Sequence, residues 1–339
     1  MSDPLANRYV VSEFYRSYRL DRYIQAMIPK LSRSKIQTAI RTRVRVSWHP
    51  RARASMPVLP GGEVTILFPD IVEPEIAALP RIVFEDDAIL VVDKPAGLLV
   101  HPTHSCRLNS LIHLLRADRP EIPLSLAHRL DRDTSGLILL SRTVEAARTL
   151  AGLFERREIG KTYLAIVHGR ITPPSGRIDA SLGVSQHLQV IFKRSVDGRG
   201  AQRAVTDYRV LVAGDDLSLL ELTPHTGRRH QLRAHLAAIG HPIAGDKLYG
   251  LSSRDYLKHL RGRLGEAAHR AMLADRQLLH AHRLHFAHPR SGLPVEFLSH
   301  MPEDMTALLA SHGLAVPRSL LASRGPDALP ARGISPDGP

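Results

Sequence analysis

The first clear pattern along the chain is an apolar stripe at residues 20–28, set within an otherwise polar stretch. Its members fall at i, i+3, i+4, i+7 and i+8, which is the spacing of one face of a helix: Leu20, Tyr23, Ile24, Met27 and Ile28. Pro29 is expected to end this helix, because proline cannot continue the helical hydrogen bonding.

A second helix is predicted directly afterwards. Ser32 is a candidate N-cap, and the residues expected to turn inward are Ile36, Ala39 and Ile40. The segment "VTILF", which follows the turn at Gly61 and Gly62, is expected to form a short strand. The first part of the chain is therefore predicted to be a small helical and β unit.

From residue 82 onward, short apolar runs with strand character alternate with longer helical stretches. "RIVFEDDAILVVDKP" predicts two strands around an Asp-Asp turn. Further strands are predicted at "GLILLSR", "KTYLAIVHG", "LQVIFK", "AVTDYRVLVA" and "LSLLELTP", and helices at "VEAARTLAGLFERRE" and "GRRHQLRAHLAAIG". These segments predict an α+β domain in which a large mixed, mainly antiparallel sheet is flanked by helices.

Changes of composition divide the 339 residues further, and this length fits roughly two domains. We expect a basic domain at 1–70, a linker at 71–81, a larger domain at 82–310 and a disordered tail at 317–339. The linker is acidic and carries two prolines. The tail is rich in Pro, Gly and Ser and has no periodicity.

The formal net charge is +13, and most of it lies near the start of the chain. Between Arg8 and Arg53, twelve lysines and arginines oppose two acids, which gives a net charge of +10. An isolated charge run is usually a solvated surface, but clustering on one compact folded unit is the electrostatic footprint of nucleic-acid binding. We therefore expect a structured RNA partner, contacted by Arg33, Lys35, Arg41 and Arg43.

Other features exclude several classes of protein. Cys106 is the only cysteine, so an intrachain disulfide and a cysteine-based zinc site are both excluded. The histidine-rich stretches "HAHRLHFAH" and "HPTHSC" lack the further ligands of a metal site, and a structural or RNA-contacting role is favoured. No secretory signal and no apolar run of the ~20 residues that span a bilayer is evident. We expect a cytoplasmic monomer without membrane attachment.

Two stretches of the larger domain place polar side chains among apolar ones. In "HRLDRDTSG", Asp131 lies on a loop before a buried strand, and Asp133 is the rival candidate for an acid. In "KTYLAIVHG", Tyr163 shares a sheet face with Ala165 and Val167, because side chains alternate along a strand. Taken singly, each pattern has a common structural explanation, namely a surface ion pair and a core tyrosine.

A third stretch is "TPHTGRRHQLRAHLAAIGHPIAGDKLYG". Thr226 and Gly227 are expected to start a helix that carries Arg229 and Arg233 one turn apart. A Thr-Gly pair before a helix is by itself usually a cap. The chemical meaning of the three stretches depends on their combination.

Together they closely resemble the RluA-type family of RNA pseudouridine synthases. H-R-L-D-x-x-T-S-G, K-x-Y-x-A-x-V-x-G and T-G-R-x-H-Q-L-R-x-H-L…G-H-P-I-x-G-D-x-x-Y-G occur in the family's order. "EDDAILVVDKPAGLLVHPT" and "LHAHRLHFAHPRSGLPVEF" are also similar to family segments, so the resemblance covers residues 10–305. The family implies the pseudouridine synthase fold.

The front unit resembles the small RNA-binding domain first seen in ribosomal protein S-four. The residues that match its pattern are Leu20, Asp21, Ser32, Arg33 and Ser34. Two positions depart from the pattern: Arg43 stands where that family usually has glycine, and "SWHPRAR" replaces its Asn-Gly turn.

The resemblance implies a role for each candidate residue. Asp131 would be the catalytic carboxylate, kept ionised by Arg233, and Tyr163 would stack on the flipped uracil and could serve in the final proton removal. Arg129 would fill the space that the base vacates. RNA contact is further expected from His128, Arg132 and Arg228.

The implied reaction converts uridine in RNA to pseudouridine, is redox-neutral and needs no cofactor. Large-subunit ribosomal RNA, free or in a ribosomal precursor particle, is the expected substrate, because a front module of this type often accompanies such enzymes. The alternatives are a transfer-RNA pseudouridine synthase and a non-catalytic RNA-binding protein of ribosome assembly. A hydrolase using Asp131 and Asp133 fits poorly, because acids two residues apart cannot easily flank one bond.

Overall fold

The computed structural model describes residues 5–28, 32–68, 76, 78–103, 106, 108–185 and 193–321. Pro29, most of the predicted linker and most of the predicted strand at 188–193 lie outside the described residues. The chain divides into two compact units, Met1–Glu73 and Pro74–Pro339. No helix in the described ranges is both long and apolar enough to cross a membrane.

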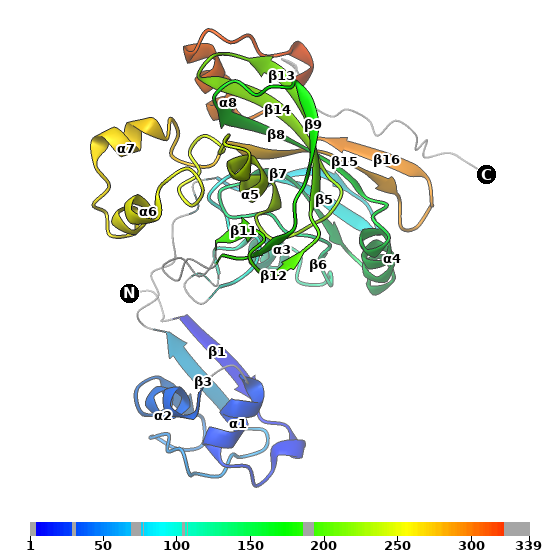
Figure 1. The fold of residues 1–339 in the computed structure, drawn as a ribbon. Coiled ribbons are helices and arrows are strands. Elements are labelled where there is room, and N and C mark those ends of the chain that lie inside the picture. The colour runs from blue at the N-terminus through cyan, green and yellow to red at the C-terminus, as the bar shows by residue number, and fades with distance from the viewer. Residues whose placement is uncertain are drawn as a thin grey trace, which may run out of the picture. The chain divides into compact units, whose positions relative to one another are not determined.

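The first unit packs two helices against a small sheet (Figure 1). Its elements are β1 (Leu5–Val10), a 3-10 turn (Glu13–Tyr15), α1 (Leu20–Met27), α2 (Arg33–Thr42), β2 (Val44–Val46) and β3 (Glu63–Phe68). The sheet is antiparallel in the order β1-β3-β2. Both predicted helices and the predicted strand are confirmed, and Ser32 caps α2 by accepting a hydrogen bond from the backbone N of Lys35.

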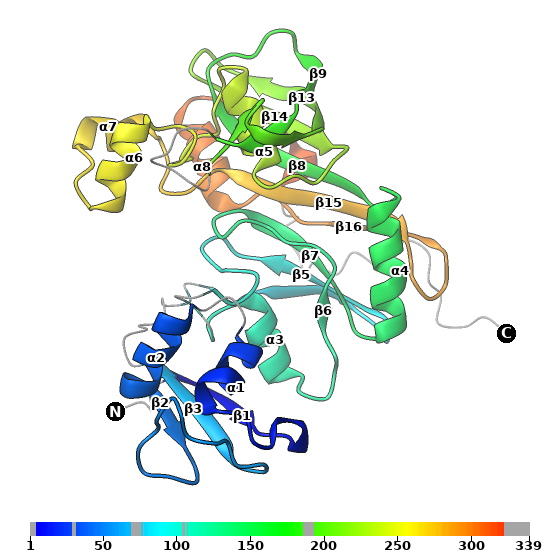
Figure 2. The ribbon, with the colours of Figure 1, turned by 60° about the horizontal axis from the view of Figure 1, so that its bottom comes forward.

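The second unit is built on a ten-stranded sheet (Figures 1 and 2). Its strands are β4 (Arg81–Glu85), β5 (Ile89–Lys94), β6 (Ser125–Leu126), β7 (Ser135–Ser141), β8 (Gly160–His168), β9 (Ser175–Asp179), β13 (Val205–Ala213), β14 (Leu217–Pro224), β15 (Leu279–Ala287) and β16 (Pro294–Leu298). The main order is β4-β5-β7-β15-β8-β14-β13-β9, and β16 and β6 add to β15 and β7. Among the described strands of this sheet, only the β7–β15 pair is parallel. The predicted mainly antiparallel α+β fold is confirmed.

In the described part of this unit, six helices and a small sheet accompany the large sheet. The helices are α3 (Leu111–Asp118), α4 (Val144–Glu155), α5 (Gln231–Ala238), α6 (Ser253–Leu260), α7 (Glu266–Ala271) and α8 (Glu303–Ser311). The small sheet comprises β10 (Leu182–Val184), β11 (Arg194–Val196) and β12 (Arg199–Gln202). A final 3-10 turn spans Arg318–Leu320.

Strands β5 and β7 are buried on both faces, which explains why they read as continuous apolar runs. On one face, Leu150 of α4 packs in a cluster with Val91 and Leu139. On the other face, Leu111 of α3 packs with Val92 and Leu140. The two helices therefore hold this half of the sheet between them.

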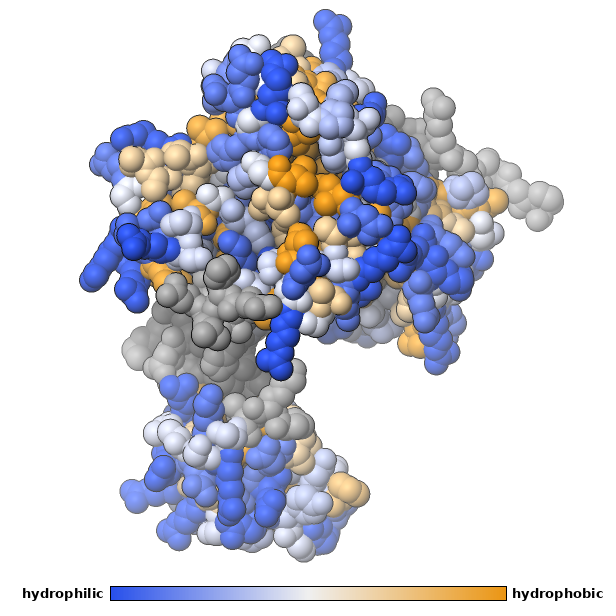
Figure 3. All heavy atoms as spheres, viewed as in Figure 1, coloured by the Kyte–Doolittle hydropathy of each residue, from blue (hydrophilic) through white to orange (hydrophobic). Residues whose placement is uncertain are grey.

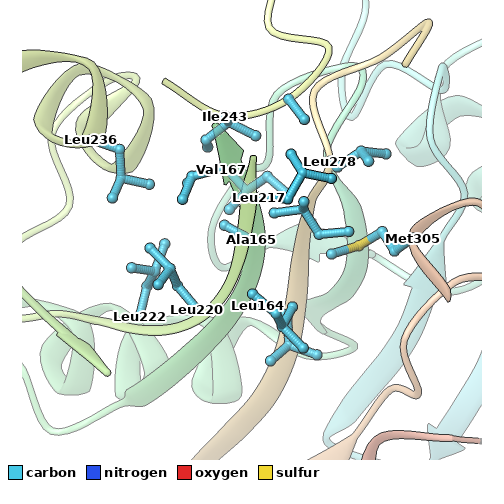
Figure 4. Packing of buried hydrophobic residues seen from close by; sticks show 14 of the residues in the cluster. Leu164, Ala165, Val167, Leu217, Leu220, Leu222, Leu236, Ile243, Leu278 and Met305 are labelled. Carbon is cyan, nitrogen blue, oxygen red and sulfur yellow. The ribbon is translucent and has the colours of Figure 1, made fainter. Parts of the chain in front are cut away.

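The other half of the sheet is covered by α5 and α8. Figure 4 shows Leu236 of α5 on one side of the β8–β14 pair, near Leu220 and Leu222. Met305 of α8 lies on the opposite side, near Leu164. Because Leu222 pairs with Tyr163, the tyrosine lies on the face of the sheet that α5 covers.

The two halves meet where β7 and β15 pair for only two residues. Gly136 has φ +107°, and a Cβ there would lie 2.3 Å from the carbonyl oxygen of Ala281. Only glycine fits this close approach of two backbones. The Thr-Ser-Gly stretch after Asp131 is thus fixed to the centre of the sheet.

Three predicted boundaries are wrong. The helix expected to start at Thr226 and Gly227 begins at Gln231, since His230 takes a left-handed conformation with φ +56°. Strand β4 already includes Arg81, the last residue assigned to the linker. The tail predicted to be disordered from 317 starts folded, because Leu320 is buried and its carbonyl accepts a hydrogen bond from Met301.

Candidate active site

A cavity of about 400 Å³ opens on the α5 side of the large sheet. Its walls come from the loop before β7, from β8 and α4, and from the loop that leads into α5. The predicted residues that line it are His128, Arg129, Asp131, Tyr163, Arg228 and Arg233. The structure thus brings together residues from all three sequence motifs.

Asp131 and Arg233 form an ion pair in this cavity. Arg233 Nη1 donates a hydrogen bond of 2.6 Å to Asp131 Oδ2, although 102 positions separate the two residues. The side chain of Arg233 is only 8% exposed, and that of Asp131 is 27% exposed. Asp131 Oδ1 accepts no hydrogen bond within the described ranges, and His230 Nε2 lies 3.7 Å from it.

Asp131 is held in its ionised form. Burial raises the pKa of Asp131, but the Arg233 guanidinium, together with the charge of Arg229, lowers it by more, so the pKa lies below its usual value. Burial lowers the pKa of His230 to about 4, although Asp131 opposes this shift. His230 is therefore neutral at pH 7, and Arg233 is the main partner of the carboxylate.

Arg233 has a second acidic partner that the sequence analysis missed. Its Nε and Nη2 donate to Asp246 Oδ2 and Oδ1 at 2.7 and 2.8 Å. Asp246 Oδ1 also accepts from the backbone amides of Leu248 and Tyr249, both at 3.0 Å. The only sequence signal for Asp246 was its place in the "GDKLYG" part of the third motif.

Tyr163 faces the same cavity from β8. Burial, and after it the charge of Asp131, raise the pKa of Tyr163 well above its usual value. Its hydroxyl is therefore protonated at neutral pH. The ring offers a flat apolar face on which a base can stack.

Arg129 lies at the exposed rim of the cavity, with no ion pair or hydrogen bond in the described part of the chain. Its neighbour His128 points inward, where Nε2 accepts a hydrogen bond from the Leu139 amide and the ring packs 5.5 Å from that of Phe154. Burial, with a smaller contribution from Lys161, lowers the pKa of His128 to about 3. The neutral ring fixes the loop to β7, and because His128 also lines the cavity, its contact with RNA stays a prediction.

The remaining predicted RNA contacts lie outside this arrangement or at its edge. Arg228 is exposed at the cavity rim, and its Nε donates to the Arg203 carbonyl. Arg132 is exposed and pairs with Asp133 at 2.9 Å, and neither lines the cavity. In the first unit, the four predicted contacts are all exposed: Arg33, Lys35, Arg41 and Arg43.

Two lysines near the site were also missed. Lys94 is fully buried and its Nζ donates to three carbonyls, those of Pro95, Leu98 and Arg132, which ties the Asp131 loop to β5. Lys161 lines the cavity two residues before Tyr163. Their only signal was their place within quoted stretches, Lys94 in "EDDAILVVDKPAGLLVHPT" and Lys161 at the start of "KTYLAIVHG". In the described part of the chain, no group of three or more potential ligands could hold a metal ion.

Comparison with known proteins places these features in a family. A family model described as RNA pseudouridylate synthase matches residues 88–238. The ribosomal large subunit pseudouridine synthase D of Nitrosomonas europaea is 35% identical over 300 residues, which cover 86% of this chain and 83% of the relative. The protein of the same name from Zymomonas mobilis is 36% identical over 316 residues, which cover 86% and 92%.

A solved structure agrees with the sequence relatives. Human RNA Pseudouridylate Synthase Domain Containing 1 superimposes with a TM-score of 0.54 at 29% identity, over 75% of this chain and 94% of that chain. The chain belongs to the RNA pseudouridylate synthase family and is an isomerase of that class. The family predicted from the three motifs is confirmed.

Proposed function

We propose that this protein converts uridines of large-subunit ribosomal RNA to pseudouridine and that Asp131 is its catalytic carboxylate. The observation that carries the catalytic assignment is the ion pair of Asp131 with the buried Arg233 inside the cavity. Relatives at 33–36% identity that are named for the large ribosomal subunit support the substrate.

The reaction needs an ionised acid next to the sugar. When the N1–C1′ bond of uridine breaks, positive charge develops on the ribose and negative charge on the uracil. A carboxylate can then add to the sugar, add to the base or remove a ribose proton, and each route requires its ionised form. Arg233 supplies that form by occupying Oδ2, while Oδ1 is left for the substrate.

Arg129 and Tyr163 contact the flipped nucleotide and the space that it leaves. The target uridine must leave its stack, which costs a few kcal/mol. Arg129, exposed at the rim, is placed to fill the vacated space, and the Tyr163 ring to stack on the flipped uracil. These contacts offset the cost of extrusion.

The last step removes the proton from ring carbon C5 after the C5–C1′ bond has formed, and N1 gains a proton in exchange. Because the pKa of Tyr163 is raised, its hydroxyl can accept this proton only while passing its own proton to a base. Among the described residues that line the cavity, Asp131 is the one acid. We assign the relay from C5 through Tyr163 to Asp131, which also returns the proton that N1 needs.

The first unit adds RNA affinity in this proposal and is an RNA-binding domain of the ribosomal protein S-four type. Helix α2 presents Arg33, Lys35 and Arg41 at exposed positions, while α1 and α2 bury their apolar faces. Asp21, which matches that domain's pattern, is buried and pairs with Arg19 at 2.9 Å. The charged face thus belongs to a folded unit, as electrostatic RNA binding requires.

Mapping of pseudouridines tests this function. Large-subunit ribosomal RNA from cells with and without the protein should differ at one or more uridines, and the wild-type gene should restore them. Total transfer RNA from the same cells serves as the control and should be unchanged. A difference confined to transfer RNA, or no difference in either RNA, would contradict the proposed substrate.

A further inference from the structure

Residues 252–271 form a helical arm that projects from the large sheet. Figures 1 and 2 both show α6 and α7 to one side of the strands. Neither helix contains a buried residue, so the arm adds little to the core. It is nevertheless an ordered element: Ser252 caps α6, and its Oγ accepts from the backbone N of Asp255 at 3.1 Å.

The arm is basic and its tip carries the excess charge. It contains five lysines and arginines against two acids, a net charge of +3 within 20 residues. Lys258 pairs with Asp255 and Arg270 with Glu266. The two remaining tip cations, Arg261 and Arg263, are exposed and have no ion pair with any described residue.

The tip has a defined backbone. The amide of Gly262, with φ +65°, donates to the His259 carbonyl, and the amide of Arg263 donates to the Lys258 carbonyl. This is a glycine-terminated helix end of the Schellman type. It presents Arg261 and Arg263 on either side of the glycine, next to Leu260, which is 62% exposed. Figure 3 shows mostly hydrophilic side chains over this part of the surface.

The root of the arm reaches the active site. Tyr256 of α6 packs with Leu248 and Tyr249, and the Tyr249 ring lies 5.2 Å from the guanidinium carbon of Arg233. Tyr256 also interacts electrostatically with Arg132, the residue that follows Asp131. RNA that enters the cavity therefore passes within reach of the arm.

We propose that this arm binds the RNA that flanks the target uridine, with Arg261 and Arg263 on phosphates and Leu260 against a splayed base. The proposal rests on the proposed function and extends it to a second contact surface. Paired arginines beside an exposed apolar side chain suit unpaired RNA, in which phosphates and base faces are both accessible. An acidic protein is the alternative partner, and the test below distinguishes it.

The test compares two double variants of the full chain. Arg261→Gln/Arg263→Gln removes the tip charges, and Arg170→Gln/Arg209→Gln removes the same charge from exposed surface pairs that do not line the cavity. The probe is an unmodified large-subunit ribosomal RNA transcript. The Kd is measured between 50 and 300 mM salt, and the single-turnover rate at saturating RNA.

We expect the tip variant to bind about tenfold more weakly than the wild type, with the slope of log K against log salt reduced by about 1.5 and the saturating rate retained. The control variant should stay within about twofold of the wild type. Equal Kd and slope for the two variants would overturn the proposal, including the case in which the arm binds a protein instead. If the wild type binds RNA without turnover, the proposed function is wrong. The comparison of Kd values then still tests whether the arm binds RNA.

The apolar contact is tested by Leu260→Ala. Because the side chain is largely exposed, its loss should leave the fold intact. We expect about threefold weaker binding with an unchanged salt slope, since no charge is lost. Binding equal to that of the wild type would overturn the assignment of Leu260.

Discussion

Arg233 is held by Asp246 through two parallel hydrogen bonds, from Nε at 2.7 Å and from Nη2 at 2.8 Å. Asp246 has no exposed side-chain surface, and two backbone amides fix it in turn. This bidentate contact sets the plane of the guanidinium. The remaining Nη1 is thereby directed at Asp131 before any RNA binds.

Asp246 should therefore act as a positioning residue for catalysis. In Asp246→Asn, one carboxylate oxygen becomes an amide that cannot accept from Arg233, so the guanidinium loses its fixed plane. We expect kcat to fall about 10- to 100-fold while the Kd for RNA changes less than about threefold. Single-turnover rates and filter binding measure the two quantities.

A purely structural role would give a different pattern. Asp246→Ala removes the bidentate partner of the buried Arg233 and leaves that guanidinium with Asp131 alone, so it should lower the free energy of unfolding by about 3–5 kcal/mol. Asp246→Asn should lose far less stability and still lose turnover. Loss of rate only in proportion to loss of folded protein would contradict the positioning role.

The pH dependence of turnover should depend on Arg233. In the wild type the pKa of Asp131 is lowered, so the carboxylate is ionised at every pH above the usual pKa of an aspartate. Its contribution to stability is present above the unfolded-state pKa and is lost as pH falls through the folded-state pKa. The acid limb of kcat should therefore lie below pH 4 or be masked by unfolding.

Arg233→Lys should shift the acid limb of the kcat profile to higher pH. A single ammonium cannot bridge Asp131 and Asp246 in the same geometry, so burial would again raise the pKa of Asp131. We expect kcat to be at least about 100-fold lower at pH 7 and to rise between pH 5 and 8, where the wild type is flat. A flat profile with wild-type rate in this variant would show that the guanidinium is not required.

Tyr163 combines two roles that substitutions can separate. Tyr163→Phe keeps the stacking ring and removes the hydroxyl, so kcat should fall while RNA affinity stays within about twofold. Tyr163→Leu removes both the ring and the hydroxyl. Its affinity for RNA should be lower than that of Tyr163→Phe, because base stacking on an aromatic ring contributes about 1–3 kcal/mol. Full turnover by Tyr163→Phe would exclude the proton relay.

Much of the fold could be predicted from local patterns. The apolar stripe of α1 and the cap at Ser32 defined the helices of the first unit, and the alternation in "KTYLAIVHG" placed Tyr163 correctly with Ala165. The predicted start of α5 was wrong, because Thr226 belongs to the loop before the helix. Its Oγ1 donates a hydrogen bond of 2.7 Å to Oε1 of Gln231, the first residue of the helix. A side-chain bond of this kind has no periodic signature.

The site was harder to predict than the fold. Family resemblance implied that Asp131 and Arg233 meet, but no spacing rule joins residues 102 positions apart. Asp246 and Lys94 were missed because each acts through a three-dimensional contact, with Arg233 and with the Arg132 carbonyl. Buried charges reveal their role only when their partners are known.

The most direct measurement is the single-turnover rate of pseudouridine formation by Asp131→Asn at saturating RNA, together with its Kd. Asp133→Asn is the matched control, because that acid lies on the same loop but outside the cavity. We expect Asp131→Asn to bind RNA within about threefold of the wild type and to react at least about 10⁴-fold more slowly, with the control within a few-fold of the wild type. Pseudouridine formation by Asp131→Asn at a rate near that of Asp133→Asn would contradict the central claim.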